Sequence, residues 1–220
     1  MPAGQQRNKH KQERQAFGIT VLHPGHPEVW RLRHEAAPPT LHGQKVWRAS
    51  FLLMDYLQQH GLHTGSRVLE LGCGWGLVGI YCAKTFNAQV TGLDADAAVF
   101  PYLQLHAQGN GVHIDTRQCT FADLLPQELA AFDLVVGADI CFWDELVDPL
   151  YHIVQHSVKA GVAEILVADP DRPPFEELCA RCVEQGNAQV FDWEITRPMK
   201  VGGKILRVVG NAARIGSVRA

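Results

Sequence analysis

Strand-like and helix-like segments alternate along this chain from Arg67 onward, and this alternation restricts the fold more than any other feature of the sequence. Apolar runs typical of buried strands are each followed by a run with helical spacing. The expected strands are residues 67–73, 89–95, 113–119, 132–140 and 163–170, and the expected helices are residues 76–86, 96–111, 148–160 and 173–186. Such an order predicts a parallel sheet with helices on both faces.

The last two apolar segments lie too close together for another crossover. Residues 188–198 and 204–210 are typical of strands, and only residues 199–203 separate them. A connection this short permits an antiparallel hairpin and excludes a parallel crossover. We therefore predict an α/β fold: a doubly wound, mostly parallel, seven-stranded sheet with a C-terminal antiparallel hairpin.

The chain before residue 65 is expected to be organised differently. Residues 1–16 are basic and nearly free of apolar side chains, which predicts a flexible tail. Residues 17–64 are expected to form a hairpin and a helix, with two short strands within residues 19–33 around a His-Pro-Gly-His-Pro turn. The sequence leaves open whether this hairpin borders the substrate or covers a sheet edge. Residues 65–212 form the predicted main domain.

The composition is that of an ordinary globular protein and limits the partners. Hydrophobic residues make up 46% and charged residues 20%, and the net charge of −3 gives no overall basic field that would favour nucleic acid or an anionic membrane. No apolar run approaches the ~20 residues of a membrane helix, and none follows the basic start as in a signal peptide. The six cysteines have no regular spacing. These features predict a cytoplasmic protein without nucleic-acid or membrane partners.

A cluster of glycines lies between the first expected strand and helix, in the segment VLELGCGWGLVGI at residues 68–80. Ligands of open parallel sheets bind beyond the carboxyl ends of strands, where helix N–H groups point outward. The spacing Gly74-x-Gly76-x-x-Gly79 matches a dinucleotide fingerprint, and Asp94 follows where a carboxylate can bind ribose hydroxyls. No Gly-Lys-Ser/Thr follows the glycines, which argues against a phosphate-binding P-loop.

Glu70 discriminates between the classes of cofactor. It precedes Gly72 by two residues, so its carboxylate would repel a pyrophosphate at the same helix terminus. A cofactor that carries a positive charge and no phosphate suits this position better. A nicotinamide-dependent oxidoreductase fits the glycine pattern but is disfavoured by Glu70 and by the terminal hairpin. The alternative explanation of Glu70 is an acid that caps the following helix.

From about residue 40 to residue 210 the chain resembles the seven-strand S-adenosylmethionine-dependent methyltransferases. The segment ELGCGWG at residues 70–76 is similar to their first motif, and GLDA at residues 92–95 is similar to their ribose-binding segment. The resemblance implies S-adenosylmethionine as the cofactor. No metal is expected, because the Cys-x-x-Cys of Cys179 and Cys182 falls on an apolar helix stripe and has no second pair nearby. The cofactor-binding residues that the resemblance implies are Trp47, Glu70, Gly72, Cys73, Gly74, Asp94, Ala95, Thr120, Phe121 and Ala138.

The resemblance also implies individual roles. Glu70 would lie near the methionine end of the cofactor, Asp94 would hold the ribose diol, and Phe121 would stack on adenine. Thr120 stands where the family often has an acid, and Asp123 is an alternative for that contact.

A second motif points to the methyl acceptor. Asp139-Ile-Cys-Phe142 resembles the Asp/Glu-x-x-Tyr/Phe motif of the protein-lysine methyltransferase branch, and residues 43–57 resemble the segment that this branch carries before its first motif. Residues 167–178, VADPDRPPFEEL, are similar to a Gly-Asp-Pro-Gly-Arg segment of the enzymes that methylate the electron-transfer-flavoprotein β-subunit, with Asp171 in the place of a glycine. The resemblance implies a protein-lysine N-methyltransferase.

Asp139 and Phe142 are the catalytic residues that this motif implies. A carboxylate can orient the acceptor amine and take or relay its proton, and an aromatic wall of Phe142 with Trp47 or Trp143 suits a methylated ammonium. Helix capping by Asp139 and ordinary packing of the aromatic rings are the alternatives. At the level of function, a small-molecule methyltransferase and a non-catalytic S-adenosylmethionine-binding assembly factor remain open.

Overall fold

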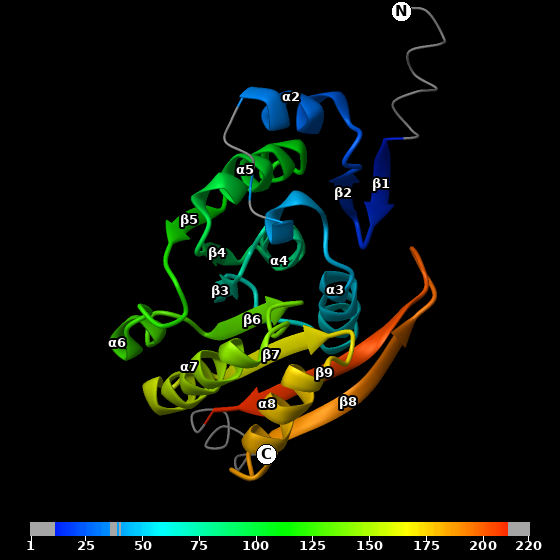
Figure 1. Ribbon diagram of the computed structural model, residues 1–220. Helices are drawn as coiled ribbons and strands as arrows, with labels where there is room; N and C mark the ends of the chain where they lie inside the picture. Colours follow the sequence, from blue (N-terminus) through cyan, green and yellow to red (C-terminus); the bar gives the residue numbers. More distant parts are fainter. Residues whose placement is uncertain (1–11, 36–38, 40, 211–220) are drawn as a thin grey trace, which may run out of the picture.

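The computed structural model describes residues 12–35, 39 and 41–210, and its main element is a seven-stranded sheet in the order β5-β4-β3-β6-β7-β9-β8 (Figure 1). All neighbours pair in parallel except β9, which is antiparallel to both β7 and β8. The predicted fold class, including the C-terminal antiparallel hairpin, is confirmed. The strands are β3 (Arg67–Leu71), β4 (Gln89–Asp94), β5 (Asp115–Gln118), β6 (Leu134–Ala138), β7 (Glu164–Asp169), β8 (Ala188–Ile195) and β9 (Val201–Val209).

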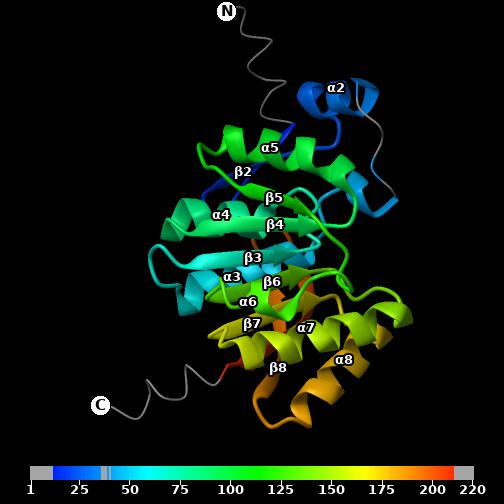
Figure 2. The same cartoon turned by 90° about the vertical axis from the view of Figure 1, so that its left-hand side faces the viewer.

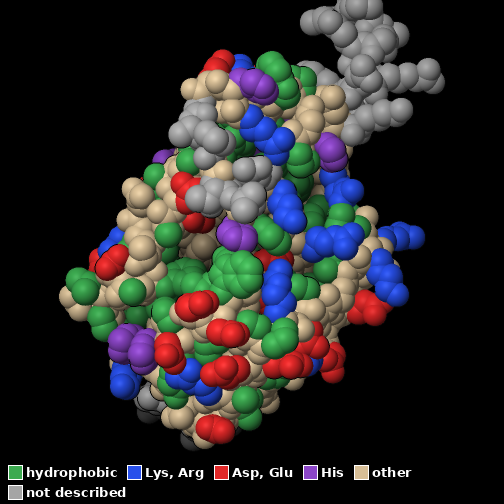
Figure 3. All heavy atoms as spheres, viewed as in Figure 1, with side chains coloured by type: hydrophobic (Ala, Val, Ile, Leu, Met, Phe, Trp, Pro, Cys, Tyr) green, Lys and Arg blue, Asp and Glu red, His purple; other side chains and the backbone are tan. Residues whose placement is uncertain are grey.

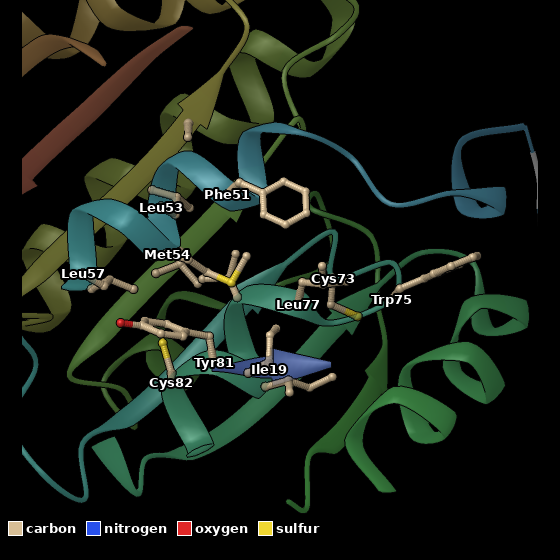
Figure 4. Close-up of a cluster of buried hydrophobic side chains, with 14 of the residues drawn as sticks. Ile19, Phe51, Leu53, Met54, Leu57, Cys73, Trp75, Leu77, Tyr81 and Cys82 are labelled. Atoms are coloured by element: carbon tan, nitrogen blue, oxygen red, sulfur yellow. The ribbon is translucent and has the colours of Figure 1, made fainter. Parts of the chain in front are cut away.

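Helices cover both faces of this sheet (Figure 2). One face carries α3 (Ala49–His60), α4 (Leu77–Phe86) and α5 (Phe100–Gly109), and the other carries α6 (Pro126–Leu129), α7 (Val147–Ala160) and α8 (Pro173–Val183). Each face has its own buried hydrophobic cluster, and Figure 4 shows the one in which α3 and α4 meet. The described part of the chain also contains three short 3-10 helices, η1 (Leu41–Gln44), η2 (Ala97–Val99) and η3 (Asp144–Leu146).

The C-terminal hairpin has a different boundary from the one that the sequence predicts. Residues 199–203 are expected to connect the strands, but β9 already begins at Val201 and includes Gly202 and Gly203. A Cβ atom at Gly203 would collide with the backbone oxygen of Asp169 on β7. Both glycines, typical of turns, are therefore strand residues, and Gly203 lets two backbones approach closely.

The front of the chain corrects two further predictions. Strand β1 (Glu13–Ala16) pairs with β2 (Ile19–Leu22), so a flexible tail up to residue 16 is wrong for these strand residues, and residues 1–11 lie outside the described part. The second expected strand is instead helix α2 (Pro27–Glu35). Its start at a proline, an acid in its first turn, basic residues in its last turn and an ion pair between Glu28 and Arg31 all favour a helix.

The β1–β2 hairpin lies on helices rather than along an edge of the main sheet. Ile19 is 1% exposed and lies in the cluster with side chains of α3 and α4 (Figure 4). The backbone N–H of Leu22 donates to Nε2 of His106 over 3.2 Å, which ties the hairpin to α5. In the part of the chain that the structure describes, no helix is both long enough and apolar enough to cross a bilayer.

Candidate functional site

A cavity of about 360 Å³ lies at the carboxyl ends of β3, β4 and β6, where the order of the strands reverses. All predicted site residues except Glu70 and Cys73 line it, together with eight residues that the sequence did not single out. The predicted ones are Trp47, Gly72, Gly74, Asp94, Ala95, Thr120, Phe121, Ala138, Asp139 and Phe142, and the further ones are His42, Gly43, Asp96, Val99, Ala122, Ile140, Leu146 and Pro149.

The glycine turn after β3 brings backbone, rather than side chains, to the wall of this cavity. Gly72 and Gly74 both have left-handed conformations, with φ of 55° and 51°. A Cβ atom at Gly72 would lie 2.7 Å from Cγ2 of Ile140, whereas one at Gly74 would meet nothing within 4 Å. Gly74 therefore leaves open space against the backbone, as the sequence predicts for a bound ligand.

Glu70 lies beneath this turn and caps helix α4. Its Oε1 accepts from the N–H of Val78 over 3.2 Å and its Oε2 from the N–H of Gly79 over 3.0 Å. A Cβ atom at Gly79 would lie 2.7 Å from Oε2, so the fourth glycine permits this approach. Glu70 and Cys73 line a smaller cavity of about 20 Å³, which they share with Trp47 and the glycine turn. Glu70 therefore makes the contacts expected of an acid that caps the following helix.

The burial of Glu70 predicts a pH dependence of stability. Burial raises the pKa of Glu70 from about 4.5 to about 8 against the opposing effect of its two hydrogen bonds. Between these values the group is protonated in the folded protein and ionised in the unfolded chain. The free energy of unfolding therefore falls as pH rises through this window, by up to about 1.4 kcal/mol per pH unit from this group.

The substitution Glu70→Gln isolates this contribution. We expect a flatter pH dependence of the unfolding free energy from pH 5 to pH 8, because the amide does not titrate. We also expect a loss of about 1–3 kcal/mol at pH 5, because the amide NH₂ cannot accept from the second N–H. Urea unfolding at several pH values measures both, and equal slopes for the two proteins would contradict the assignment.

Asp94 fixes the glycine turn from the end of β4. Its Oδ2 accepts from the N–H of Gly74 and its Oδ1 from the N–H of Asp96, each over 3.0 Å. Burial raises its pKa. Asp94 and Ala95 also line the large cavity, so the position predicted for the ribose-binding acid lies at the cavity wall.

The loop after β5 supplies another wall. Phe121 and Thr120 line the cavity. The Thr120 hydroxyl donates to Oδ2 of Asp123 over 2.6 Å, and Asp123 is exposed and lies outside the lining. Asp123 thus contacts the cavity only through Thr120, and its place as the alternative acid stays a prediction.

Asp139 follows β6 in a left-handed conformation, with φ of 60°, and its side chain is 3% exposed. Its Oδ2 accepts from the N–H of Ala49, the first residue of α3, over 2.9 Å. Its Oδ1 accepts from Nη2 of Arg172 over 2.6 Å, and Nη1 of Arg172 lies 2.6 Å from Oδ2 of Asp169. Burial raises the pKa of Asp169 to about 6, and Arg172 opposes that shift. One guanidinium therefore bridges two buried carboxylates.

No role was predicted for Arg172, although it lies within the segment VADPDRPPFEEL that carries part of the resemblance. Arg172 follows β7 and is 27% exposed. It is separated from Asp139 by 33 residues. The available signal was the Asp-Pro-x-Arg spacing in that segment, which places Arg172 near Asp169. That spacing does not identify Asp139 as the second carboxylate that Arg172 binds.

Aromatic side chains form a cluster at the wall of the cavity that Asp139 also lines. Phe142 stacks on His42 with a centroid distance of 4.5 Å, and the Trp47 indole donates to the backbone oxygen of His42 over 2.7 Å. Trp143 contacts the edge of Phe142 and is 58% exposed, and it does not line the cavity. No pattern singles out His42, which lies in η1 after a proline-rich stretch.

The charged side chains in the wall of the large cavity are acidic. These acidic side chains are those of Asp94, Asp96 and Asp139, and within the described ranges no Lys or Arg lines the cavity. Nor do the described His, Cys, Asp and Glu side chains form any group of three or more that could hold a metal. The wall is therefore suited to a cationic ligand and poorly suited to a pyrophosphate.

Comparison with known proteins gives a consistent assignment. A family model described as lysine methyltransferase matches residues 32–179. A protein N-lysine methyltransferase of Xenopus tropicalis, METTL21A, is 35% identical over 117 residues, covering 50% of this chain and 53% of the relative. A ubiquinone biosynthesis O-methyltransferase of Hahella chejuensis is 33% identical over 84 residues, covering 38% and 35%. The chain thus spans about half the length of the Xenopus tropicalis relative and about a third of the length of the Hahella chejuensis relative.

Solved structures share the fold. The Thermus thermophilus 16S rRNA N2 G1207 methyltransferase RsmC, solved with AdoMet and guanosine, superposes with a TM-score of 0.60 at 21% identity, covering 90% of this chain and 50% of that one. A precorrin-6y C5,15-methyltransferase of Geobacter metallireducens superposes with a TM-score of 0.57 at 12% identity, covering 72% of this chain and 87% of that one. At these identities the similarity establishes the fold.

Proposed function

We propose, because this chain belongs to the lysine methyltransferase family, that it transfers a methyl group from S-adenosylmethionine to a lysine side chain of a protein. The observation that carries the proposal is Asp139, a buried and ion-paired carboxylate in the cavity wall beside the aromatic pair Phe142 and His42. The name of the Xenopus tropicalis relative, a protein N-lysine methyltransferase, supports a protein acceptor.

The residues of the cavity fit this cofactor. The open space against Gly74 suits a ligand that lies on the backbone, and Asp94 offers carboxylate oxygens for ribose hydroxyls. Phe121 offers a flat apolar face for adenine, with Trp47, Gly72, Ala95, Thr120 and Ala138 around it. The three wall carboxylates suit a sulfonium, and they argue against the nicotinamide alternative, whose pyrophosphate they would repel. Glu70 and Cys73 would act from outside this cavity, Glu70 by capping α4 and Cys73 through its backbone in the glycine turn.

The reaction needs a neutral amine held in line with the transferred carbon. When bound, S-adenosylmethionine supplies a methyl carbon on a positively charged sulfur, and the new C–N bond forms as that C–S bond breaks. Asp139 accepts a hydrogen bond from the lysine nitrogen, attracts the cationic side chain into the cavity and takes or relays the proton that the nitrogen loses. Phe142 and His42 form the wall along which the aliphatic stem and the methylated ammonium lie.

Two measurements test the proposal. We expect micromolar binding of S-adenosylmethionine and none of NADH in calorimetric titration of the purified protein. We then expect the labelled methyl group to enter protein in a cell extract, with methyl-lysine released on acid hydrolysis. An extract whose lysines have been blocked by reductive dimethylation is the matched control.

Each alternative has its own outcome in these measurements. Label in the small-molecule fraction alone would replace the protein acceptor by a small molecule, as the name of the Hahella chejuensis relative suggests for that enzyme. Cofactor binding without any transfer would support a non-catalytic assembly factor. Binding of NADH alone would overturn the methyltransferase assignment. A cytoplasmic location is also proposed, and the unpaired state of all six cysteines supports a reducing compartment.

A further inference from the structure

A second cavity of about 290 Å³ lies beside the site, where the β1–β2 hairpin, the start of α3 and the turn between β8 and β9 meet. We call it the basic groove, and its lining includes Arg14, Lys45, Arg48, Phe51 and Met199. Nη1 of Arg14 lies 3.6 Å from the sulfur of Met199, which joins the hairpin to the β8–β9 turn.

Three consecutive residues, 45–47, lie between the basic groove and the large cavity. Lys45 and Val46 line both the groove and the small cavity beneath the glycine turn. Trp47 lines that small cavity and the large one. A peptide whose lysine entered the large cavity would therefore have neighbouring residues within reach of the groove.

The groove concentrates positive charge in a protein whose net charge is −3. Arg14, Lys45 and Arg48 are exposed, and among the described residues none of them makes an ion pair with a carboxylate. Glu13 is the acidic residue of the lining, and it lies 3.5 Å from His26. Figure 3 shows Lys and Arg side chains gathered on this side of the face and acidic side chains gathered below them.

The two neighbouring cavities thus have opposite charge. The wall of the large cavity carries Asp94, Asp96 and Asp139, whereas the groove carries Arg14, Lys45 and Arg48. A lysine fits the first and an acidic side chain fits the second. We propose that the basic groove binds an acidic segment of the protein substrate next to the lysine that is methylated, an inference that rests on the proposed function.

An acidic peptide fits the groove better than other anions do. The partly exposed Met199, with the buried Val21 and Phe51 behind it, gives the lining an apolar part on which a peptide side chain can pack. The carboxylates of the adjacent cavity would repel a longer polyanion such as nucleic acid.

Fluorescein-labelled peptides of about 12 residues with one central lysine test the proposal. One peptide carries glutamate on both sides of the lysine and its counterpart carries glutamine. By fluorescence anisotropy without cofactor, we expect the glutamate peptide to bind about tenfold more tightly. About 0.5 M NaCl should remove most of that difference, because exposed charges are screened.

Charge reversal locates the binding. Arg14→Glu together with Arg48→Glu is expected to abolish the preference for glutamate. Lys159→Glu, an exposed reversal at the end of α7, is expected to preserve it. All variants are compared with the unchanged protein by thermal unfolding and by their affinity for S-adenosylmethionine. Their affinity for S-adenosylmethionine should stay within about twofold of that of the unchanged protein.

The possible outcomes distinguish a failure of the groove proposal from a failure of the proposed methyl transfer. Equal binding of the two peptides, or equal effects of the groove and Lys159 variants, would overturn the proposal. Tighter binding of a single-stranded oligonucleotide than of the glutamate peptide would overturn it in favour of nucleic acid. Selective peptide binding without any methyl transfer would remove the proposed function and leave the groove as a peptide site.

Discussion

Asp139→Asn is expected to lower kcat by about two to four orders of magnitude, the range typical of a lost acid–base group, while cofactor binding is retained. The amide is neutral, so it neither attracts the lysine cation nor accepts its proton. The fold should persist because Arg172 keeps its pairing with Asp169. Single-turnover methylation and calorimetric titration of the variant measure the two effects separately.

The matched control is Asp192→Asn, the same chemical change at an exposed position on β8. It should leave both kcat and cofactor affinity unchanged. An Asp139→Asn protein with full activity would contradict the proposed role of this carboxylate. A variant that lost cofactor affinity instead of turnover would make Asp139 a cofactor-binding residue.

Arg172→Met is expected to lower the free energy of unfolding by about 3–5 kcal/mol, because it leaves two buried carboxylates without their shared cation. The side chains of Asp139 and Asp169 are 3% and 0% exposed. Arg172 opposes the rise in the pKa of Asp169, so its removal raises that pKa further above 6. The loss of stability should therefore be larger at pH 8, where the carboxylates are ionised, than at pH 5.

Arg172→Lys is the control for charge. A lysine ammonium supplies one point charge and lacks the planar fork that reaches both carboxylates, so we expect partial recovery of stability. As a positioning residue, Arg172 should also affect the pH dependence of kcat, whose acidic limb should move to higher pH in Arg172→Met and partly return in Arg172→Lys. A stability loss below about 1 kcal/mol would show that the bridge is not formed in solution.

The order of strands and helices could be predicted from the sequence because its signals are local. Hydrophobic period identifies each element, and the five-residue separation expected before the last strand sufficed to exclude a parallel crossover. The predicted boundaries of strands and helices were less accurate where a residue type is compatible with two kinds of local structure. Gly203 is typical of a turn, yet it serves as a strand residue against the Asp169 backbone, and Pro27 begins a helix where a strand was predicted.

The site could be predicted in part for the same reason. Gly72, Asp94, Phe121 and Asp139 follow the ends of successive strands, and the carboxyl ends of parallel strands meet at one edge of a sheet. Two explanations of Glu70 were open, a place near the methionine end of the cofactor and a helix cap. Its oxygens accept from N–H groups at the N-terminus of α4, which are otherwise without a partner in the helix, so the capping contacts are present.

The sequence by itself thus determined the sheet, its reversed strand and part of the cavity wall. Only the tertiary structure brought Arg172 to Asp139, the N–H of Ala49 to the same carboxylate across 90 residues, and His42 onto Phe142. It also assembled the basic groove from Arg14, Lys45 and Arg48. Such contacts join elements far apart in the chain, and no local period encodes which side chains meet when those elements pack.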